Sequence, residues 1–488
     1  MTLYNNVCNW IISHIKISVV NKIAVIVILI YYYIGLLSYI TVPFPQIFRL
    51  FKPNSGIAIG LRAFMVAIIC LYSLLVLCVY KKKFPWRWLV AFSFVLLGTL
   101  FTMIISPQVY KYVYIESLYK VVHLVQLSQG LNKNIVMFLS AIADFAFAFC
   151  ALFIMPYALN NKRQLLFLLV PIVFIGCLEC CYSIIKEKDI YIYLINNSDD
   201  IFGGYGHEAG ATFGNKEDWG AFLTLSFVCA IASSFFIKKD KKYKWIIAIM
   251  FWACALIFSV FAVLSLCKTA MLGIFLSLVI LFIGLWYLSF KKGKVTAILY
   301  SIIASLIIII VVMFFALPQL HSYGIFKKIY DFVNRLIFER TDKALDGRTS
   351  LWMNFVQNLR SYNFFFGFGK NGVAVYTTTL SPEGQSTMHN GIFYFLGSYG
   401  LFGFILLIIC LLRSLIAIFK VWKINQGYVF LFISAFLSCM AFVLNEAEVL
   451  IFSTSNPIFV YNILLVVFPS GLIIKEKNVN KCEGLVYA

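Results

Sequence analysis

Long apolar runs alternate with short polar segments along almost the whole chain of 488 residues. About 20 apolar residues cross the hydrocarbon layer of a bilayer as one helix. Runs of about this length lie near residues 23–42, 61–80, 88–105, 135–157, 165–185, 219–237, 245–263, 269–290, 295–317, 391–412, 427–445 and 457–474. The pattern predicts an all-α, polytopic integral membrane protein with about 12 transmembrane helices, and residues 1–488 are expected to form a single integral membrane domain.

Composition agrees with this class, because 62% of the residues are hydrophobic and only 12% are charged. About a quarter of the residues of an ordinary soluble domain are charged, so a soluble protein is excluded. The first apolar run is long and lacks the small residues of a cleavage site at its end. We therefore expect it to be a retained helix and not a cleaved signal peptide.

The charge pattern predicts the topology. A net charge of +20 is spread so that cations gather in every second loop, as at Lys81 to Arg87 and at Lys238 to Lys244. By contrast, the 187–218 loop, which precedes the span before Lys238 to Lys244, is acidic. Because lysine and arginine concentrate in cytoplasmic loops, both termini are predicted to be cytoplasmic. This explanation needs no nucleic acid, and none is expected as a partner.

The longest polar segment, residues 318–388, is predicted to be an extracytoplasmic loop with structure of its own. Apolar residues recur at helical spacing over 325–337 and again over 348–361, which indicates two helices, the first of them amphipathic and on the membrane surface. The sequence FFFGFGKNGV (364–373) follows, where glycines permit tight turns and bare backbone amides.

Four cations, Arg340, Arg348, Arg360 and Lys370, are distributed along this loop. A guanidinium group binds two phosphate oxygens at once, and bare backbone amides add further donors. The loop is therefore suited to a lipid-linked phosphate. Anionic lipid head groups would also explain these cations, and the spacing alone does not separate the two interpretations.

Four blocks in the C-terminal two thirds of the chain resemble the signature of the O-antigen ligase and O-antigen polymerase superfamily. They are GATFGNKEDWGAF (210–222), SLCKTAMLG (265–273), GRTSLWMNFVQNLRSYNFFFGFGKNGV (347–373) and HNGIFYFLGSYGLFG (389–403). In that family an Arg and a Trp open a helix, a turn of Gly and Phe follows, and His-Asn begins a membrane span. His207 and Lys268 depart from the pattern, since the family usually has arginine at both places and lysine lacks the bidentate fork.

The resemblance implies a glycosyltransferase that takes an undecaprenyl-pyrophosphate-linked oligosaccharide as donor, on the outer face of the bacterial plasma (inner) membrane. Such a transfer needs a base for the acceptor hydroxyl and positive charge for the departing pyrophosphate. An unperturbed imidazole has a pKa of about 6.5 and is largely neutral at physiological pH, so His389 is the candidate catalytic base. The candidate pyrophosphate-binding residues are Arg348, Lys268, Arg340, Arg360 and His207.

No cofactor and no metal ion are expected. Many polyprenyl-phosphate-dependent glycosyltransferases hold a divalent ion with acidic residues of the first outer loop, and the 43–60 loop has none. Glu446, Glu448 and Asn390 are candidate acceptor-binding groups, although the two glutamates are equally consistent with solvated loop carboxylates. Asp144 lies within a predicted span, so it is either a functional group or an interhelical hydrogen-bond partner.

Gly397, Gly400 and Gly403 recur at a spacing of three after His389. This spacing predicts a flat stripe on one helix that admits a neighbouring helix closely and so fixes the direction of His389.

Three functions remain open at this stage. We favour a polymerase of O-antigen or capsule type, which adds the oligosaccharide to a second lipid-linked unit. A ligase that uses a lipid or protein anchor as acceptor is the first alternative. A lipid-linked oligosaccharide flippase or another transporter is the second, and no repeat of two similar halves supports it. A flippase and a chain-length regulator of the same pathway are expected partners, beside the lipid bilayer.

Overall fold

The computed structural model describes the greater part of the chain. The described residues are 17–37, 56–109, 112–115, 120–123, 131–196, 211–213, 216–237, 243–291, 293, 299, 301–302, 349, 351–353, 355–356, 361–370, 372–373, 388–444, 450–453 and 456–486. The predicted amphipathic helix at 325–337 and most of the predicted span at 295–317 lie outside them.

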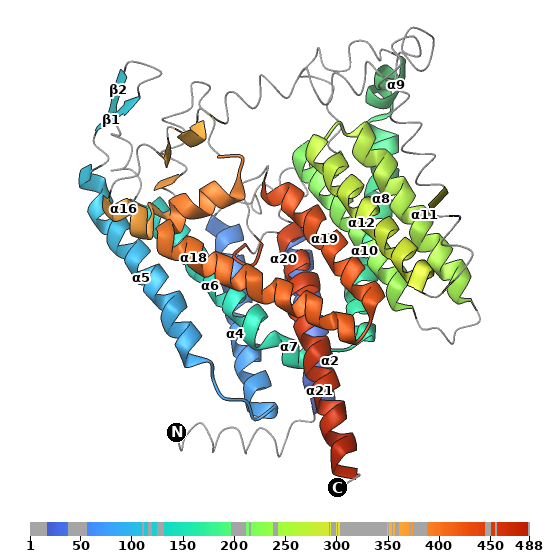
Figure 1. The fold of residues 1–488 in the computed structure, drawn as a ribbon. Helices are drawn as coiled ribbons and strands as arrows, with labels where there is room; N and C mark the ends of the chain where they lie inside the picture. Colours follow the sequence, from blue (N-terminus) through green and yellow to red (C-terminus); the bar gives the residue numbers. More distant parts are fainter. Residues whose placement is uncertain are drawn as a thin grey trace.

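The described part is almost entirely helical (Figure 1). The longer helices are α2 (Ile17–Leu37), α4 (Gly56–Val79), α5 (Trp86–Val109), α6 (Leu131–Phe153), α8 (Lys162–Lys186), α10 (Lys216–Phe236), α11 (Lys244–Leu264), α12 (Lys268–Lys291), α18 (Gly391–Lys420), α19 (Gln426–Val443) and α21 (Phe468–Val486). Shorter segments are α7 (Met155–Ala158), α9 (Lys188–Asn196), α16 (Ser361–Phe366), α20 (Asn456–Asn462), the 3₁₀ turns η4 (Ala211–Phe213) and η7 (Val421–Lys423), and the π-helical η8 (Ile463–Val467).

The membrane class is confirmed by the length and composition of these helices. Among the described residues, 8 helices are long and apolar enough to cross a membrane. Shorter apolar helices cover 17–30, 64–79 and 137–153, within α2, α4 and α6. Each predicted run apart from 295–317 therefore coincides with a helix, because about 20 mostly apolar residues have no better arrangement in lipid. The total of about 12 spans stays a prediction.

The prediction of an all-α fold class is confirmed, and one short hairpin is present beside the helices. Strands β1 (Tyr112–Ile115) and β2 (Lys120–His123) pair antiparallel between α5 and α6, with Tyr112 opposite His123. Their sequences, YVYI and KVVH, are rich in the β-branched and aromatic residues that favour strands. The pattern was hidden because the hairpin lies in a polar connection between two apolar helices.

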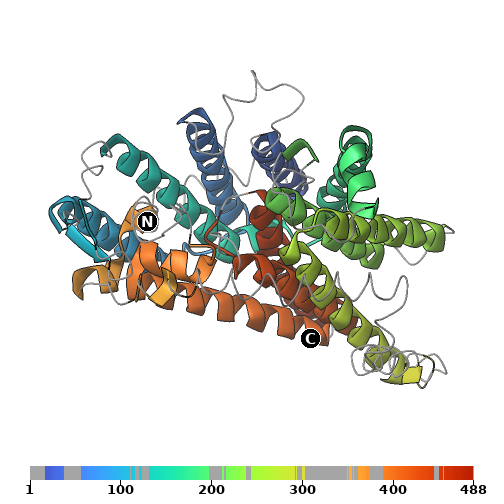
Figure 2. The ribbon, with the colours of Figure 1, turned by 90° about the horizontal axis from the view of Figure 1, so that it is seen from above.

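The helices form two rows when seen from above (Figure 2). One row contains α5, α6, α4, α2 and α8, and α18 extends along the opposite side, where it contacts α5, α19 and α21. The most enclosed helix is α10, which packs against α8, α11 and α12 and buries most of its residues. Small residues permit this: a Cβ atom at Gly220 would lie 2.5 Å from Sγ of Cys267 at the start of α12.

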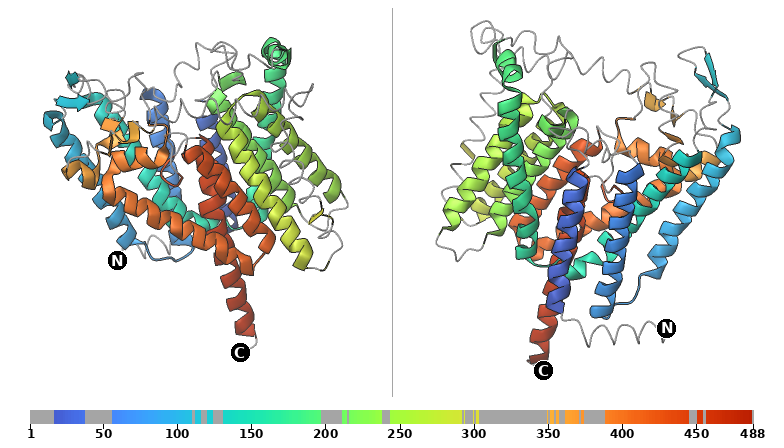
Figure 3. Two further views of the ribbon diagram at one scale, coloured as in Figure 1. Left: turned by 45° about the horizontal axis from the view of Figure 1, so that its top comes forward. Right: turned by 180° about the vertical axis from the view of Figure 1, so that it is seen from behind.

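The lysine-rich connections lie on one side of the molecule. The turns from α4 to α5, from α7 to α8 and from α18 to α19 are all at the lower edge in Figure 1, where the last helix α21 also ends. The start of α2 is on this side too (Figure 3), whereas the starts of α12 and α18 are on the other side. This arrangement is the one that the alternation of charge predicts, although which side is cytoplasmic stays a prediction.

Helix α18 is broken at Gly400, where φ is 66° and ψ is −166°. The expected continuous glycine stripe is therefore wrong. A Cβ atom at Gly400 would lie 2.3 Å from the carbonyl carbon of Phe365 in α16, while Gly397 faces Phe355 and Gly403 faces Tyr399 of its own helix. The three glycines serve three different contacts, and the break lets α16 approach the backbone of α18.

Replacing Gly400 by alanine is expected to destabilise the fold by roughly 1–3 kcal/mol, because this backbone conformation is essentially restricted to glycine. The thermal unfolding midpoint of the purified protein in detergent measures the effect. The matched control is Gly60→Ala in α4, where a Cβ atom meets nothing within 4 Å and alanine favours the helix. Equal midpoints for Gly400→Ala and the unchanged protein would contradict the break as described.

Candidate functional site

The Gly-Phe turn of the third family-like block lies against the backbone of α18. Gly367 and Gly369 both have φ of 73°, as expected for this turn. The Phe368 N–H donates to the carbonyl oxygen of Gly397 at 2.7 Å, and a Cβ atom at Gly367 would lie 2.5 Å from that same oxygen. The break at Gly400 interrupts the helical bonding that this carbonyl would otherwise join, so the turn supplies the donor instead.

Helix α5 supports the turn from its other side. The Thr99 hydroxyl lies 3.0 Å from the carbonyl oxygen of Phe366, the last residue of α16. The ring of Phe366 packs against Phe94 of α5 and Phe402 of α18, with ring centroids 5.5 and 5.2 Å apart. Phe366 thus lies between α5 and α18, and these contacts restrict how the end of α16 can move.

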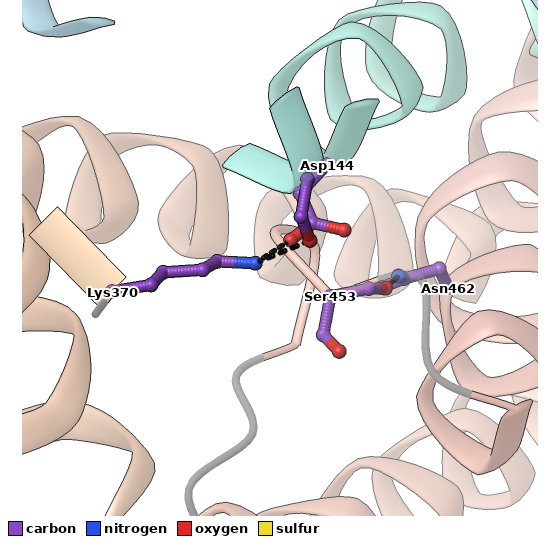
Figure 4. A network of polar contacts seen from close by, with 5 residues as sticks. Asp144, Lys370, Ser453 and Asn462 are labelled. Atoms are coloured by element: carbon purple, nitrogen blue, oxygen red, sulfur yellow. Dashed lines mark hydrogen bonds and ion pairs between the residues drawn. The ribbon is translucent and has the colours of Figure 1, made fainter. Parts of the chain in front are cut away.

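A buried ion pair ties the end of this turn to α6. The ammonium group of Lys370 contacts the carboxylate of Asp144 (Figure 4) and lies 3.4 Å from Oγ of Ser140, one helical turn earlier in α6. The two charged side chains are only 15% and 4% exposed. Burial alone would lower the pKa of Lys370, but the Asp144 carboxylate raises it above the ordinary value for lysine, so the ion pair persists. Of the two interpretations of Asp144, the structure favours the interhelical partner.

The segment that follows the two candidate acceptor glutamates passes beside this ion pair (Figure 4). Asn462 of α20 holds it: its Oδ1 accepts from the Ile451 N–H at 2.6 Å and its Nδ2 donates to the Ser453 carbonyl at 3.1 Å. The ring of Phe452 packs against Phe145 of α6 and Phe395 of α18. Glu446 and Glu448 themselves lie outside the described residues, and their role stays a prediction.

His389 is fixed at the N-terminus of α18. Its φ of 45° is in the left-handed region. On one side the indole N–H of Trp352 donates to the Met388 carbonyl at 2.9 Å, and its ring stacks on Phe393. On the other side Asn390 caps the helix, since its Oδ1 accepts from the backbone N–H groups of Ile392 and Phe393. The imidazole is partly buried at the end of a helix whose dipole favours negative charge nearby.

The N-cap gives Asn390 a structural role, because the side-chain oxygen that might bind an acceptor already holds the helix. Acceptor binding by Asn390 remains a prediction.

The first two family-like blocks also meet each other. Lys268 is partly buried as the first residue of α12, after a turn in which Leu266 has φ of 54°. Gly220 of α10 packs on Cys267 in this turn. The four blocks are thus brought together in two pairs, the first two through α10 and α12 and the last two through α16 and α18. Both α12 and α18 begin on the upper side of the molecule in Figure 1.

Glu187 is a buried acidic residue that the sequence analysis counted only among the loop acids. Its Oε2 accepts from the hydroxyl groups of Ser183, at 2.5 Å, and Tyr191, and its Oε1 accepts from the Ala211 N–H at 2.8 Å. Ala211 has φ of 48° and starts the described part of the first block. Burial raises the pKa of Tyr191, which therefore stays a hydroxyl donor. The spacing of four residues between Ser183, Glu187 and Tyr191 is the one sequence signal that could have indicated this cluster, because it places the three side chains on one helical face.

Several predicted site residues lie outside the described part of the chain, namely His207, Arg340, Arg348 and Arg360. Their convergence on one substrate stays a prediction. Within the described part, no group of three or more His, Cys, Asp or Glu side chains could hold a metal ion. Metal-independent transfer stays a prediction.

Comparison with known proteins supports the family resemblance in the middle of the chain. Residues 253–408 match the family profile described as O-antigen ligase. The match runs from α11 through α12 to the middle of α18, so it contains Lys268, Lys370, His389 and the break at Gly400. It confirms the resemblance of this region to the O-antigen ligase and polymerase superfamily. No curated protein sequence matches the chain at a significant level.

Replacing Lys370 by methionine is expected to lower stability by about 3–5 kcal/mol, because the buried carboxylate of Asp144 would lose the cation that it contacts. The thermal unfolding midpoint measures this loss, with Lys188→Met on the exposed start of α9 as the matched control. An unchanged midpoint for Lys370→Met would show that the pair does not hold the turn.

Replacing Glu187 by leucine removes the acceptor of the Ala211 N–H. Hydrogen–deuterium exchange is expected to become faster in peptides that contain residue 211, whereas Asp189→Leu, on an exposed neighbour, should leave it unchanged. Equal exchange in both variants would remove Glu187 as the anchor of this segment.

Proposed function

We propose that this protein is a polysaccharide polymerase of O-antigen or capsule type. It transfers an oligosaccharide from undecaprenyl pyrophosphate to the hydroxyl group of a lipid-linked acceptor on the outer face of the plasma membrane. The observation that carries the proposal is the placement of His389, which lies within the matched region and is held by a helix cap on one side and by Trp352 on the other.

In this reaction the neutral imidazole of His389 accepts the proton of the acceptor hydroxyl. The acceptor oxygen forms a bond to the anomeric carbon of the donor, and the bond from that carbon to the pyrophosphate oxygen breaks. Undecaprenyl pyrophosphate leaves with the bonding electron pair. Charge develops on that leaving group, and fixed cations stabilise it most in a site from which water is excluded.

We assign the leaving-group charge to Arg348 and Lys268, with Arg340, Arg360 and His207 as further ligands. Lys268 is the member of this set that the structure describes, at the N-terminus of α12, where the helix dipole adds to its charge. Lys370 is excluded from the set, because its ammonium group is engaged by Asp144.

The sidedness of the helices supports an extracytoplasmic site. The lysine-rich turns lie on the side opposite to the starts of α12 and α18, and such turns face the cytoplasm in most membrane proteins. Both termini would then be cytoplasmic. A flippase that delivers the donor and a regulator of chain length are the partners that this reaction requires on that face.

A ligase is the second candidate, and one observation favours it: the matched family is described as O-antigen ligase. The chemistry is the same, and the two functions differ in whether the acceptor is another lipid-linked repeat or a separate lipid or protein anchor. The flippase alternative receives no support from the family match.

Reconstitution in liposomes with a lipid-linked oligosaccharide, followed by gel separation of the products, tests the proposal. The His389→Gln variant is expected to lose roughly 100- to 10,000-fold in rate, the usual contribution of a positioned base. The control is His123→Gln in β2, outside the four blocks. Full activity of His389→Gln at normal expression would remove the base assignment.

The same assay separates the functions by the form of the product. A ladder of increasing length is the expected result and indicates a polymerase. A single shifted band that requires an added anchor would indicate a ligase. Movement of the lipid across the bilayer without a new covalent product would indicate a flippase and contradict both enzymatic assignments.

A further inference from the structure

A groove of about 570 Å³ lies on the side of the molecule opposite to the start of α18. Its walls come from α5, the end of α6 with α7, the C-terminal half of α18, and α21. The size is within the range of about 300–1,000 Å³ that is usual for ligand sites. Most of the lining is apolar, with Ile409, Leu412, Ile416 and Ile473 among the contributing side chains.

Two cations of α18, Arg413 and Lys420, line this groove. The guanidinium carbon of Arg413 lies 4.5 Å from the ring centroid of Phe153 and 5.9 Å from that of Trp88. Cation–π contacts of this kind hold the side chain in one orientation. Lys420 follows two helical turns later on the same face of α18, so both charges point into the same groove. Among the described residues that line it, none is acidic.

The position along the membrane restricts the ligand. The groove opens beside the α7–α8 turn and the end of α18, which is the side that carries the lysine-rich connections. On the cytoplasmic side of membrane proteins, basic pockets between transmembrane helices bind the head groups of anionic lipids. A site with an apolar wall, two cations and no carboxylate is complementary to a phosphate with attached acyl chains.

We infer that this groove binds one anionic phospholipid of the cytoplasmic leaflet. Its phosphate is held by Arg413 and Lys420, and an acyl chain lies along the apolar side chains of α18 and α21. Because five helices line the groove, the bound lipid bridges them and stabilises the packing of the C-terminal half of α18. This site is separate from the one proposed for glycosyl transfer and does not depend on that function.

The test measures lipid binding on the purified full-length protein, delipidated in a mild detergent. Native mass spectrometry counts retained lipid after titration with phosphatidylglycerol or with zwitterionic phosphatidylcholine, and the thermal midpoint is followed in parallel. Phosphatidylglycerol is expected to be retained and to raise the midpoint, as any ligand of the folded state does. Phosphatidylcholine is expected to do neither.

Variants assign the binding to the groove. Arg413→Gln is expected to weaken phosphatidylglycerol binding at least about tenfold, the loss that follows from removing a charge-assisted hydrogen bond. Lys420→Gln should weaken it less, because this lysine lacks the aromatic contacts that orient Arg413. Arg163→Gln is the matched control, since this exposed arginine is in the first turn of α8 on the same side and does not line the groove.

Each midpoint shift is taken against the lipid-free form of the same variant, so a change in basal stability does not affect the comparison. Equal retention of the two lipids would overturn the inference, as would unchanged phosphatidylglycerol binding in Arg413→Gln. An equal loss in Arg163→Gln would show a general attraction to basic surface and would also overturn it.

Discussion

The arrangement of the matched region depends on one constraint, the break of α18 at Gly400 and the turn that fills it. The break frees the carbonyl of Gly397, and Phe368 of the Gly-Phe turn donates to it. Lys370, two residues further along, reaches α6 and pairs with Asp144. Backbone hydrogen bonding and a buried ion pair therefore fix the same short segment at both ends, and the start of α18, with His389, lies next to it.

The apolar surroundings in a membrane explain why Lys370 and Asp144 are paired. A single charge within an apolar bundle is costly, and a lysine or aspartate there requires a partner. The attraction between Lys370 and Asp144 offsets part of the cost of burying both, and the contact holds the turn against α6. Glu187 acts by the same principle on the other side of the bundle, where it holds the Ala211 backbone amide.

The positions of the helices could be predicted from the sequence because apolar runs of about 20 residues leave the backbone little choice in lipid. The left-handed glycines of the Gly-Phe turn were also predictable, since few other residues tolerate that conformation. The partner of Asp144 was not, because Lys370 is 226 residues away along the chain and only the packing of α6 against the turn brings them together. Similarly, the spacing of Gly400 is consistent with a continuous helical stripe. The break became apparent only from the close contact between Gly400 and α16.

Some features of the candidate site are likewise determined by local sequence, and others by the packing of distant helices. The Asn390 cap and the Trp352 contact follow from residues close to His389. The meeting of α10 with α12 and of α16 with α18 depends on glycines that permit close approach, and hydropathy does not indicate which helices will be neighbours. The groove around Arg413 belongs to this second kind, since its four walls come from distant parts of the chain.

A double-mutant cycle on the unfolding midpoint tests the central claim most directly, because it measures the coupling between the turn and α6. Asp144→Asn, Lys370→Met and the variant with both changes are compared with the unchanged protein. If the ion pair fastens the turn, the double variant loses no more stability than the worse of the two single variants, since neither charge is left alone. Additive losses would show that the two residues act independently and would contradict the account.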